Sequence, residues 1–532
     1  MGEGSAMAGE WWREAVIYQI YPRSFQDSDG DGVGNVAGVT RRLGYLEWLG
    51  VDAIWLSPIY PSPMADYGYD VSDYRDVDPL FGDLKTLEAL IAEAHYRGMK
   101  VILDYVPNHT SDRHPWFLES RSSRSAPKRD WYVWRDPAPD GGPPNNWISR
   151  FGGPAWTRDG VTGQYYYHAF LPEQPDLNWR NPHVRREMID VLRFWLDLGI
   201  DGFRVDALSA LFEDERLRDN PPNAAWTPAM PDSERQSPVH TSDLPEVHEA
   251  VAEMRATLDA YPDRVLIGEL YLPIERLVLY YGKDGRGAHL PFNFHLISTA
   301  WTATAFAALV EEYEAALPSG AWPTWVLGNH DQKRVAARLG PAQARIAAML
   351  LLTLRGTPTI YYGDEIGIPS VSIPAEAVCD PVELREPGLG RDPARTPMAW
   401  DSSPNAGFSK VKPWLPLHAD WAERNASVMS ADELSILMLH HRLIELRRKR
   451  AALRVGGYGE MSADRDCLVF ERTLGEERIA VALNFSGKSV ESGLIPVGAQ
   501  VLLSTHLDRE NSVSDGRLRP NEGVVLVVER KT

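Results

Sequence analysis

Eight short apolar runs, rich in β-branched residues, recur along the chain and are followed by helical patterns. Runs of this kind predict buried strands, and strands that alternate with helices predict a parallel sheet. The predicted strands are residues 15–22, 51–58, 100–107, 202–207, 264–270, 289–294, 324–331 and 358–365. Since eight strands close a β/α barrel, the predicted fold class is α/β, a TIM (β/α)8 barrel.

The segment between the second and third predicted strands has the periodicity of a crossover helix. Its apolar residues at positions 84, 87, 91 and 94 fall on one helical face. Asp83 is the predicted N-cap of this helix, and Gly98 is the predicted stop at its C-terminal end. Apolar positions 184, 188, 191 and 195 repeat the pattern before the fourth strand. Both segments fit the connecting helices of a barrel.

Two intervals are too long for ordinary barrel connections, and the end of the chain has a different pattern. Residues 108–180 predict an inserted domain after the third strand, and residues 209–245 predict an elaborated loop after the fourth. Near residue 455 the pattern changes to alternating strands and turns. We therefore predict that the barrel comprises residues 1–107 and 181–454 and is followed by a C-terminal β-sandwich at 455–532. The first nine residues are predicted to be a flexible lead-in.

The charge of the chain limits its partners. A formal net charge of −19 and a pI near 5.2 disfavour nucleic acid and anionic membranes, which require a positive surface. Cys379 and Cys467 are far apart, so neither a disulfide framework nor a zinc site is indicated. We find no signal-peptide pattern and no apolar stretch of about 18 residues. These features predict a cytoplasmic protein that acts on a neutral small molecule.

Four acidic residues follow or end predicted strands: Asp104, Asp206, Glu269 and Asp331. In a β/α barrel the C-terminal ends of the strands meet on one face, where active sites lie. A single acid at a strand end is most often a cap or a loop ion pair. Four such acids on separate strands predict a shared, carboxylate-rich site.

The sequences around these acids, DYVPNH, GFRVDAL, IGEL and GNHD, resemble in order the motif set of the α-amylase family (glycoside hydrolase family 13). The string QPDLN at residues 174–178 resembles the signature of its oligo-1,6-glucosidase and α-glucosidase subfamily. The resemblance covers roughly residues 11–450. It implies a retaining, exo-acting α-glucosidase that uses no cofactor for catalysis.

The resemblance also implies a role for each acid. Asp206 matches the nucleophile, Glu269 the acid/base, and Asp331 the third carboxylate, which holds sugar hydroxyls. Retention would place the carboxyls of Asp206 and Glu269 about 5–5.5 Å apart. Burial among acids should raise the pKa of Glu269. Arg204, on the same strand face as Asp206, is a predicted substrate-binding residue that should keep Asp206 ionised.

A pocket for the terminal sugar is implied by further matches to the family. They comprise an acid that binds hydroxyls, a stacking ring, two histidines, two aromatic walls and an arginine that pairs with the hydroxyl-binding carboxylate. Arg395 is the alternative for that arginine. Asp66 matches the acid, Tyr69 the stacking ring, and His109 and His330 the two histidines. Phe151 and Phe170 match the aromatic walls, and Arg391 matches the arginine.

The string DSDGDGVGN sets Asp27, Asp29 and Asp31 at alternating positions, so their oxygens could converge on a hard cation. The bidentate Glu of a complete EF-hand is absent. The resemblance implies that the backbone carbonyl of Val33 and the side chain of Asn35 complete a structural Ca²⁺ or Mg²⁺ site. A solvated acidic turn is the alternative.

Ala207 follows the matched nucleophile, at a position where relatives that prefer α-1,4 bonds carry Ala or Thr and those that prefer α-1,6 bonds carry Val. We therefore expect a preference for maltose-type bonds, with maltose, maltooligosaccharides, sucrose and aryl glucosides as the substrate class. Transfer of the glucosyl group and sucrose or trehalose-forming isomerisation need the same acids, so both stay open as alternatives. A non-catalytic, amylase-like binding subunit is a remote alternative.

Overall fold

In the computed structural model, which describes residues 10–528, eight parallel strands form a nearly closed barrel sheet. Each of the eight predicted segments contains at least part of one strand, so the predicted barrel is confirmed. The strands are β1 (Ile17–Ile20), β2 (Ala53–Leu56), β3 (Lys100–Tyr105), β7 (Gly202–Val205), β8 (Val265–Gly268), β9 (Leu290–Pro291), β10 (Thr324–Val326) and β11 (Thr357–Tyr361). Their order around the sheet is β10-β11-β1-β2-β3-β7-β8-β9. The remaining gap is bridged where the backbone N–H of Val326 donates to the carbonyl of Asn293.

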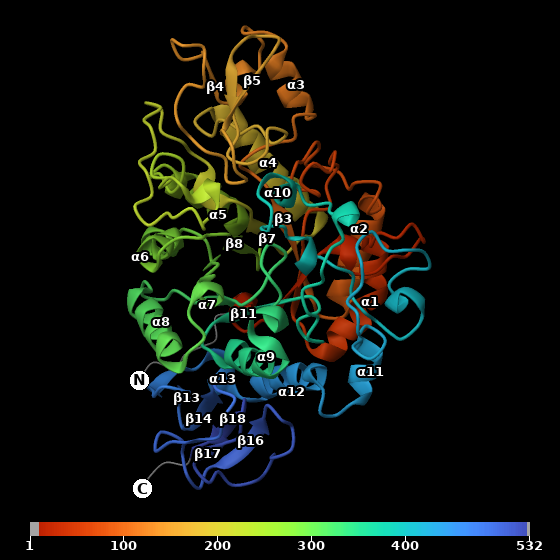
Figure 1. The fold of residues 1–532 in the computed structure, drawn as a ribbon, viewed down its shortest axis with the longest axis vertical. Coiled ribbons are helices and arrows are strands. Elements are labelled where there is room, and N and C mark those ends of the chain that lie inside the picture. The colour runs from red at the N-terminus through yellow and green to blue at the C-terminus, as the bar shows by residue number, and fades with distance from the viewer. Residues whose placement is uncertain (1–9, 529–532) are drawn as a thin grey trace.

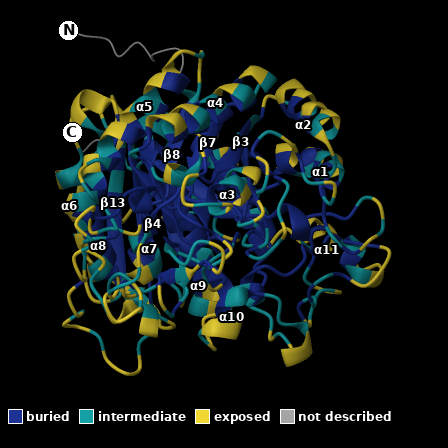
Figure 2. Ribbon diagram, turned by 90° about the horizontal axis from the view of Figure 1, so that it is seen from above, coloured by how far each residue is buried: buried dark blue, intermediate teal, exposed yellow. Residues whose placement is uncertain are grey.

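Helices surround the barrel and bury their apolar faces against its strands, as the dark strands and yellow outer helix faces of Figure 2 show. The predicted caps are present: the Asp83 carboxylate accepts from the backbone N–H of Thr86, and Gly98 has a positive φ of 75°. The longer helices are α1 (Val36–Leu49), α2 (Leu84–Tyr96), α4 (Pro182–Leu198), α5 (Val247–Asp259), α8 (Ala303–Ala316), α9 (Val335–Thr353) and α12 (Ile436–Lys449). The short ones are α6 (Ile274–Leu277), α7 (His295–Ser298), α10 (Pro381–Arg385), α11 (Ala426–Ala431) and α13 (Ala451–Val455).

Within residues 10–528, α9 is the one helix long and apolar enough to cross a membrane by length and composition. Its apolar window has a mean hydropathy of 1.2, although the helix contains Arg338 and Arg345. This helix packs against α12 and against β14 (Glu477–Asn484) of the C-terminal domain (Figure 1). Burial within the protein therefore accounts for its composition.

The segment between β3 and α4 folds beyond the C-terminal ends of the barrel strands, at the top of Figure 1. It contains α3 (Pro115–Arg121) and an antiparallel sheet of β4 (Trp134–Arg135), β6 (Tyr165–Tyr167) and β5 (Trp156–Arg158). Its small core includes Trp147 stacked on Trp156 with ring centroids 5.7 Å apart. This packed segment can form one wall of a site above the barrel.

The C-terminal end of the chain forms a five-stranded antiparallel sheet in the order β12-β13-β14-β18-β16. One face of the sheet packs on helices next to the barrel, and residues of β15 and β17 pack on the other. The second layer is thus a two-stranded ladder. The strands are β12 (Gly457–Ala463), β13 (Cys467–Leu474), β14 (Glu477–Asn484), β15 (Val490–Glu491), β16 (Gln500–Ser504), β17 (Arg517–Leu518) and β18 (Gly523–Val527). The predicted lead-in of residues 1–9 lies outside the described residues.

Candidate active site

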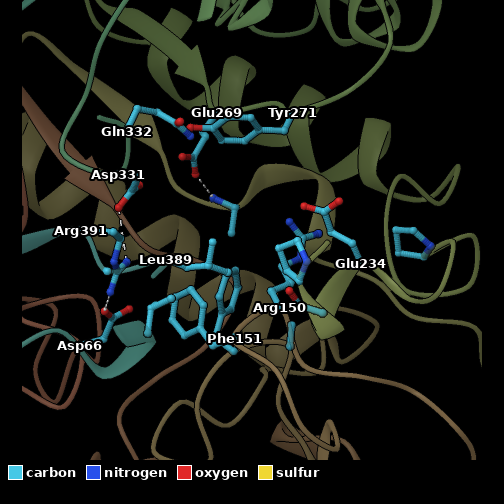
Figure 3. A pocket seen from close by; sticks show the side chains of 18 of the residues that line it. Asp66, Arg150, Phe151, Glu234, Glu269, Tyr271, Asp331, Gln332, Leu389 and Arg391 are labelled. Carbon is cyan, nitrogen blue, oxygen red and sulfur yellow. Dashed lines mark hydrogen bonds and ion pairs between the residues drawn. The ribbon is translucent and has the colours of Figure 1, made fainter. Parts of the chain in front are cut away.

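The four acids predicted to converge do so at the C-terminal ends of the barrel strands. Asp104 lies in β3, Asp206 directly follows β7, Glu269 directly follows β8, and Asp331 lies beyond β10. Asp206, Glu269 and Asp331 line a cavity of about 1780 Å³, of which Figure 3 shows a part. Asp104 is 1% exposed and is not among the lining residues. The parallel strands bring these carboxylates together because the C-terminal ends of all the strands lie on one face of the barrel.

One buried arginine holds three of these acids. Arg204 Nη1 lies 2.7 Å from Asp104 Oδ1 and 2.8 Å from Asp206 Oδ1, and its Nη2 lies 2.5 Å from Glu269 Oε1. The guanidinium is fully buried, and its central carbon lies 5.0 Å from the centre of the Trp55 ring. Because one planar group binds both Asp206 and Glu269, these two carboxylates lie side by side at the base of the cavity.

Burial controls the protonation of the two acids. It raises the pKa of Asp206 to about 7 and that of Glu269 to about 7, and in both cases the charge of Arg204 acts in the opposite direction. The rise for Glu269 agrees with the sequence prediction. For Asp206 the predicted effect of Arg204 is present, but desolvation outweighs it. The two acids therefore titrate near neutral pH, where one proton between them is a stable arrangement.

Asp331 differs from this pair in its charge state. Burial acts to raise its pKa, but His330, Arg391 and Arg395 outweigh that effect and hold the pKa below its usual range. Its Oδ1 lies 2.9 Å from Arg395 Nη2 and 3.3 Å from Arg391 Nη1. Asp331 is therefore an anion across the physiological pH range.

Ala207 contacts the acids through its backbone. Its N–H donates to Glu269 Oε2 at 2.9 Å, and its φ of 47° lies in the left-handed region. A β-branched residue adopts that conformation only with strain. Residue 207 therefore presents a methyl group to the cavity and also supports Glu269 through its backbone. No sequence pattern signals this backbone role.

The residues predicted to bind the terminal sugar all line the cavity: Asp66, Tyr69, His109, Phe151, Phe170, His330 and Arg391. The Tyr69 hydroxyl donates to Asp104 and lies 2.8 Å from His330 Nε2. Phe151 and Phe170 form an edge-to-face pair with ring centroids 5.4 Å apart. Arg204, the remaining predicted substrate-binding residue, does not line the cavity, because it is buried beneath the acids.

Gln174, in the QPDLN string, joins two of these residues. Its Nε2 donates to Asp66 Oδ2 at 3.2 Å and lies 3.0 Å from His109 Nε2. Asp176, two residues later, accepts from Asn108 and from the backbone N–H of Ala169. The string therefore fixes the inserted segment against the sugar-binding residues.

Both candidate arginines reach Asp331, but they differ in position. Arg391 lines the cavity and also pairs with Asp66 at 2.7 Å. Arg395 is buried, and its Nε donates to the backbone carbonyl of His330. Arg391 is thus the arginine that joins Asp66 and Asp331, the two carboxylates predicted to bind hydroxyls, while Arg395 supports Asp331 from behind.

Sequence reasoning missed an aromatic residue beside Glu269. Tyr271 is 50% exposed, lines the cavity and stacks on Phe294 with ring centroids 4.3 Å apart. Its hydroxyl accepts from Asn329 Nδ2 at 3.2 Å, and Figure 3 places its ring next to Glu269 and Gln332. The signal available was its position two residues after Glu269. The parts of the 209–245 loop that line the cavity had no such signal.

The acidic loop after β1 brings its three carboxylates together. Oxygens of Asp27, Asp29 and Asp31 lie within 4.8 Å of one another, and no basic group of residues 10–528 forms an ion pair with them. Asp27 accepts the backbone N–H groups of Asp29, Gly30 and Gly32, which fixes the loop. Three clustered carboxylates without a basic partner among the described residues fit a hard cation.

The two other predicted ligands of the cation, Asn35 and Val33, make hydrogen bonds within the same part of the chain. The Asn35 side chain accepts from the backbone N–H of Gly38 and is the N-cap of α1. The backbone N–H of Val33 donates to the Asp31 carboxylate at 2.7 Å. Asn35 therefore has a helix-capping role that the sequence prediction did not include.

Known proteins are similar to this chain over the range that contains these residues. A family model described as alpha amylase, catalytic domain, matches residues 19–456. The chain is 42% identical over 502 residues to a probable alpha-glucosidase of Rhizobium meliloti (strain 1021), covering 91% of each. It is 38% identical over 563 residues to an oligo-1,6-glucosidase of Parageobacillus thermoglucosidasius, covering 97% of this chain and 99% of that one. Its fold is similar to that of the alpha-glucosyl transfer enzyme XgtA, with a TM-score of 0.92, 40% identity, and coverage of 97% and 99%.

Replacing Arg204 with Met tests whether this guanidinium stabilises the buried acids. We expect the free energy of unfolding to fall by about 3–5 kcal/mol at pH 8, because three carboxylates lose their buried partner. The folded-state pKa values of these acids are already raised, and without Arg204 they rise further. The folded variant then binds more protons than the unfolded chain, so the stability of the variant falls as the pH rises. Its loss of stability relative to wild type is therefore smaller at pH 5 than at pH 8.

Urea titrations at pH 5 and pH 8 measure this difference. The control is Arg185→Met, which breaks a partly exposed pair with Glu253 and is expected to cost less than about 1 kcal/mol at either pH. An equal loss for Arg204→Met at both pH values would contradict the electrostatic account.

Proposed function

Because the chain belongs to the α-amylase family of glycoside hydrolases, we propose that it is a retaining, exo-acting α-glucosidase that releases glucose from the non-reducing end of short α-glucosides. The observation that carries this proposal is the pair of carboxylates at the base of the cavity, both bound to the guanidinium of Arg204. Their side-by-side arrangement suits a reaction that passes through a covalent glucosyl intermediate.

Hydrolysis proceeds in two displacements. The Asp206 carboxylate attacks the anomeric carbon while Glu269 gives its proton to the departing glycosidic oxygen. Glu269 then removes a proton from water, which attacks the anomeric carbon from the face that the aglycone left. The bond to Asp206 breaks, and α-glucose is released. The charge of Asp331 and the donors of Arg391 and His330 hold the hydroxyls of the distorted ring. Each acid thus returns to its starting state after one cycle.

The inner end of the cavity supports exo action. Asp66, Gln174 and Arg391 form a hydrogen-bonded group, and the inserted segment adds the wall of Phe151 and Phe170. One terminal sugar fills such a closed end, whereas a cavity of about 1780 Å³ leaves room for the aglycone outside it. The ring of Tyr271, beside Glu269, is the surface available to that aglycone.

We assign an α-1,4 preference to residue 207. Ala207 places only a methyl group beside the acids, and a larger β-branched residue would strain the backbone that supports Glu269. Differences of one or two methyl groups at such a site change selectivity by about 1–3 kcal/mol. Maltose and maltooligosaccharides are therefore the proposed substrates.

Glucosyl transfer is the second candidate function. The similarity to an enzyme described as an alpha-glucosyl transfer enzyme favours it, as does the open outer part of the cavity. In that reaction a sugar or alcohol takes the place of water at the glucosyl enzyme. The same two acids serve both outcomes, so product analysis separates them.

We also propose that the loop of Asp27, Asp29 and Asp31 binds a structural Ca²⁺ or Mg²⁺. The support is the closeness of three carboxylates that have no basic partner among the described residues. A bound cation would neutralise their mutual repulsion and hold the chain between β1 and α1. It takes no part in bond breaking, because the loop is not among the residues that line the cavity.

The variant Asp206→Asn tests the proposed reaction. It removes the nucleophile with little change in shape, so kcat/KM for maltose should fall on the order of 10⁴-fold or more. A time course by NMR with wild-type enzyme should show α-glucose first and faster use of maltose than of isomaltose. New glucosides would report transfer, and isomerised sucrose would report the isomerase alternative. Full activity of Asp206→Asn, or β-glucose as the first product, would falsify the proposal.

The pH dependence of kcat/KM for maltose is expected to be bell-shaped around about pH 7. Below that pH Asp206 takes up a proton and cannot attack, and above it Glu269 loses the proton that the departing oxygen needs. Glu269→Gln should lower kcat/KM by about 10²–10⁴-fold and abolish the decline at high pH. A wild-type profile that is level from pH 5 to pH 9 would contradict these assignments.

Calorimetric titration of chelator-treated protein with Ca²⁺ and with Mg²⁺ tests the metal proposal. One binding event is expected, and a cation at 100 times its Kd should raise the free energy of unfolding by about 2.7 kcal/mol. Asp29→Asn and Asp31→Asn should weaken binding, and they are better variants than changes at Asp27, which also holds the loop backbone. Absence of binding heat with both ions would reject the site.

A further inference from the structure

A third carboxylate is bound to Arg391, besides those of Asp66 and Asp331, and does not line the cavity. Asp380 is fully buried, and its two oxygens lie 3.2 and 3.1 Å from Arg391 Nε. Its Oδ1 also lies 2.7 Å from Nη2, and its Oδ2 accepts from the backbone N–H of Arg391 at 2.5 Å. Asp380 therefore binds one edge of the guanidinium and the backbone of the same residue.

The donors of Arg391 are divided among three acids. Asp380 takes Nε and shares Nη2, Asp66 also binds Nη2 at 2.7 Å, and Asp331 binds Nη1 at 3.3 Å. The ring of Phe151 lies over the guanidinium, 5.0 Å from its central carbon. A guanidinium offers five N–H groups in a rigid plane, so an acid that binds one edge fixes the direction of the others.

Asp380 is itself held firmly. Its backbone N–H donates to Asp392 Oδ2 at 2.9 Å, and its Oδ1 accepts from the N–H of Val382 as the N-cap of α10. Asp392 also accepts from the N–H of Cys379. This irregular segment follows the last barrel strand, and it presents a fixed negative charge to the arginine of the sugar pocket.

We propose that Asp380 is a positioning residue that holds Arg391 between Asp66 and Asp331, an inference that rests on the proposed α-glucosidase function. Without the charge of Asp380, Arg391 is free to turn and pair more closely with the two sugar-binding carboxylates. It would then compete with glucose hydroxyls for their oxygens. Asp380 keeps the arginine in place and leaves the cavity side of Asp66 and Asp331 open to the sugar.

A purely structural role for Asp380, as the cap of α10, makes a different prediction. Asn is about as good an N-cap as Asp, so Asp380→Asn keeps the cap. It removes the charge and turns one of the two oxygens that accept from Arg391 into a donor. Asp83→Asn is a matched control, because Asp83 caps α2 at an exposed position away from the cavity. The two variants make the same chemical change at two helix caps.

The test compares maltose kinetics and calorimetric binding of glucose for wild type, Asp380→Asn and Asp83→Asn. We expect Asp380→Asn to lower kcat/KM and glucose affinity by about 10- to 100-fold, since small displacements of a substrate-positioning group have effects of this size. Asp83→Asn should match wild type. If Asp380→Asn does not fold, Asp380→Ser, which also supplies a good cap, takes its place.

A second measurement asks whether Asp380 acts through Arg391. In an Arg391→Ala background the change Asp380→Asn should cost less than about 2-fold, because the group it positions is already absent. Wild-type behaviour of Asp380→Asn, or a full additional loss in the Arg391→Ala background, would overturn the proposal. If wild type does not hydrolyse α-glucosides, the proposed function fails, and glucose binding alone decides the role of Asp380. Absence of glucose binding by wild type would overturn that role as well.

Discussion

The buried guanidinium of Arg204 is the constraint on which the rest of the site depends. Three carboxylates at the end of a dry barrel would each be costly as anions, and together they would repel one another. Arg204 supplies one positive charge to all three, so it lowers that cost without removing it. The incomplete compensation leaves Asp206 and Glu269 with a pKa of about 7 each, in the range that acid/base chemistry at neutral pH requires.

A second arginine cluster has the opposite effect on its acids. Arg391 and Arg395 surround Asp331 and depress its pKa, so this carboxylate stays charged next to a pair that shares a proton. The barrel strands supply the reacting acids, whereas Arg391 and its partner Asp380 come from a segment after the last strand. The chemistry is thus fixed by the sheet, and the grip on the terminal sugar is fixed by loops.

The fold and the convergence of the acids could be predicted because both have a local signal. Strand runs alternate with helical patterns, and Asp206 and Glu269 directly follow apolar strands whose direction sets where they point. Asp380 and the cavity-lining parts of the 209–245 loop could not be predicted in the same way. Their roles depend on contacts with residues distant in sequence, and irregular segments have no periodicity from which such contacts can be inferred. Tyr271 could be predicted only in part, because its spacing from Glu269 can be read from the sequence but its stacking on Phe294 cannot.

The sequence by itself determined the barrel, the family and the position of the four acids at one end of the barrel, since these follow from periodicity and from short motifs on separate strands. Only the tertiary structure decided the charge states and the partners. The pKa of Asp206 is set by desolvation against Arg204, Glu269 is supported by the N–H of a left-handed Ala207, and Asn35 caps a helix. Burial, backbone conformation and distance between side chains exist only in the folded chain, and these quantities determine the protonation of each acid.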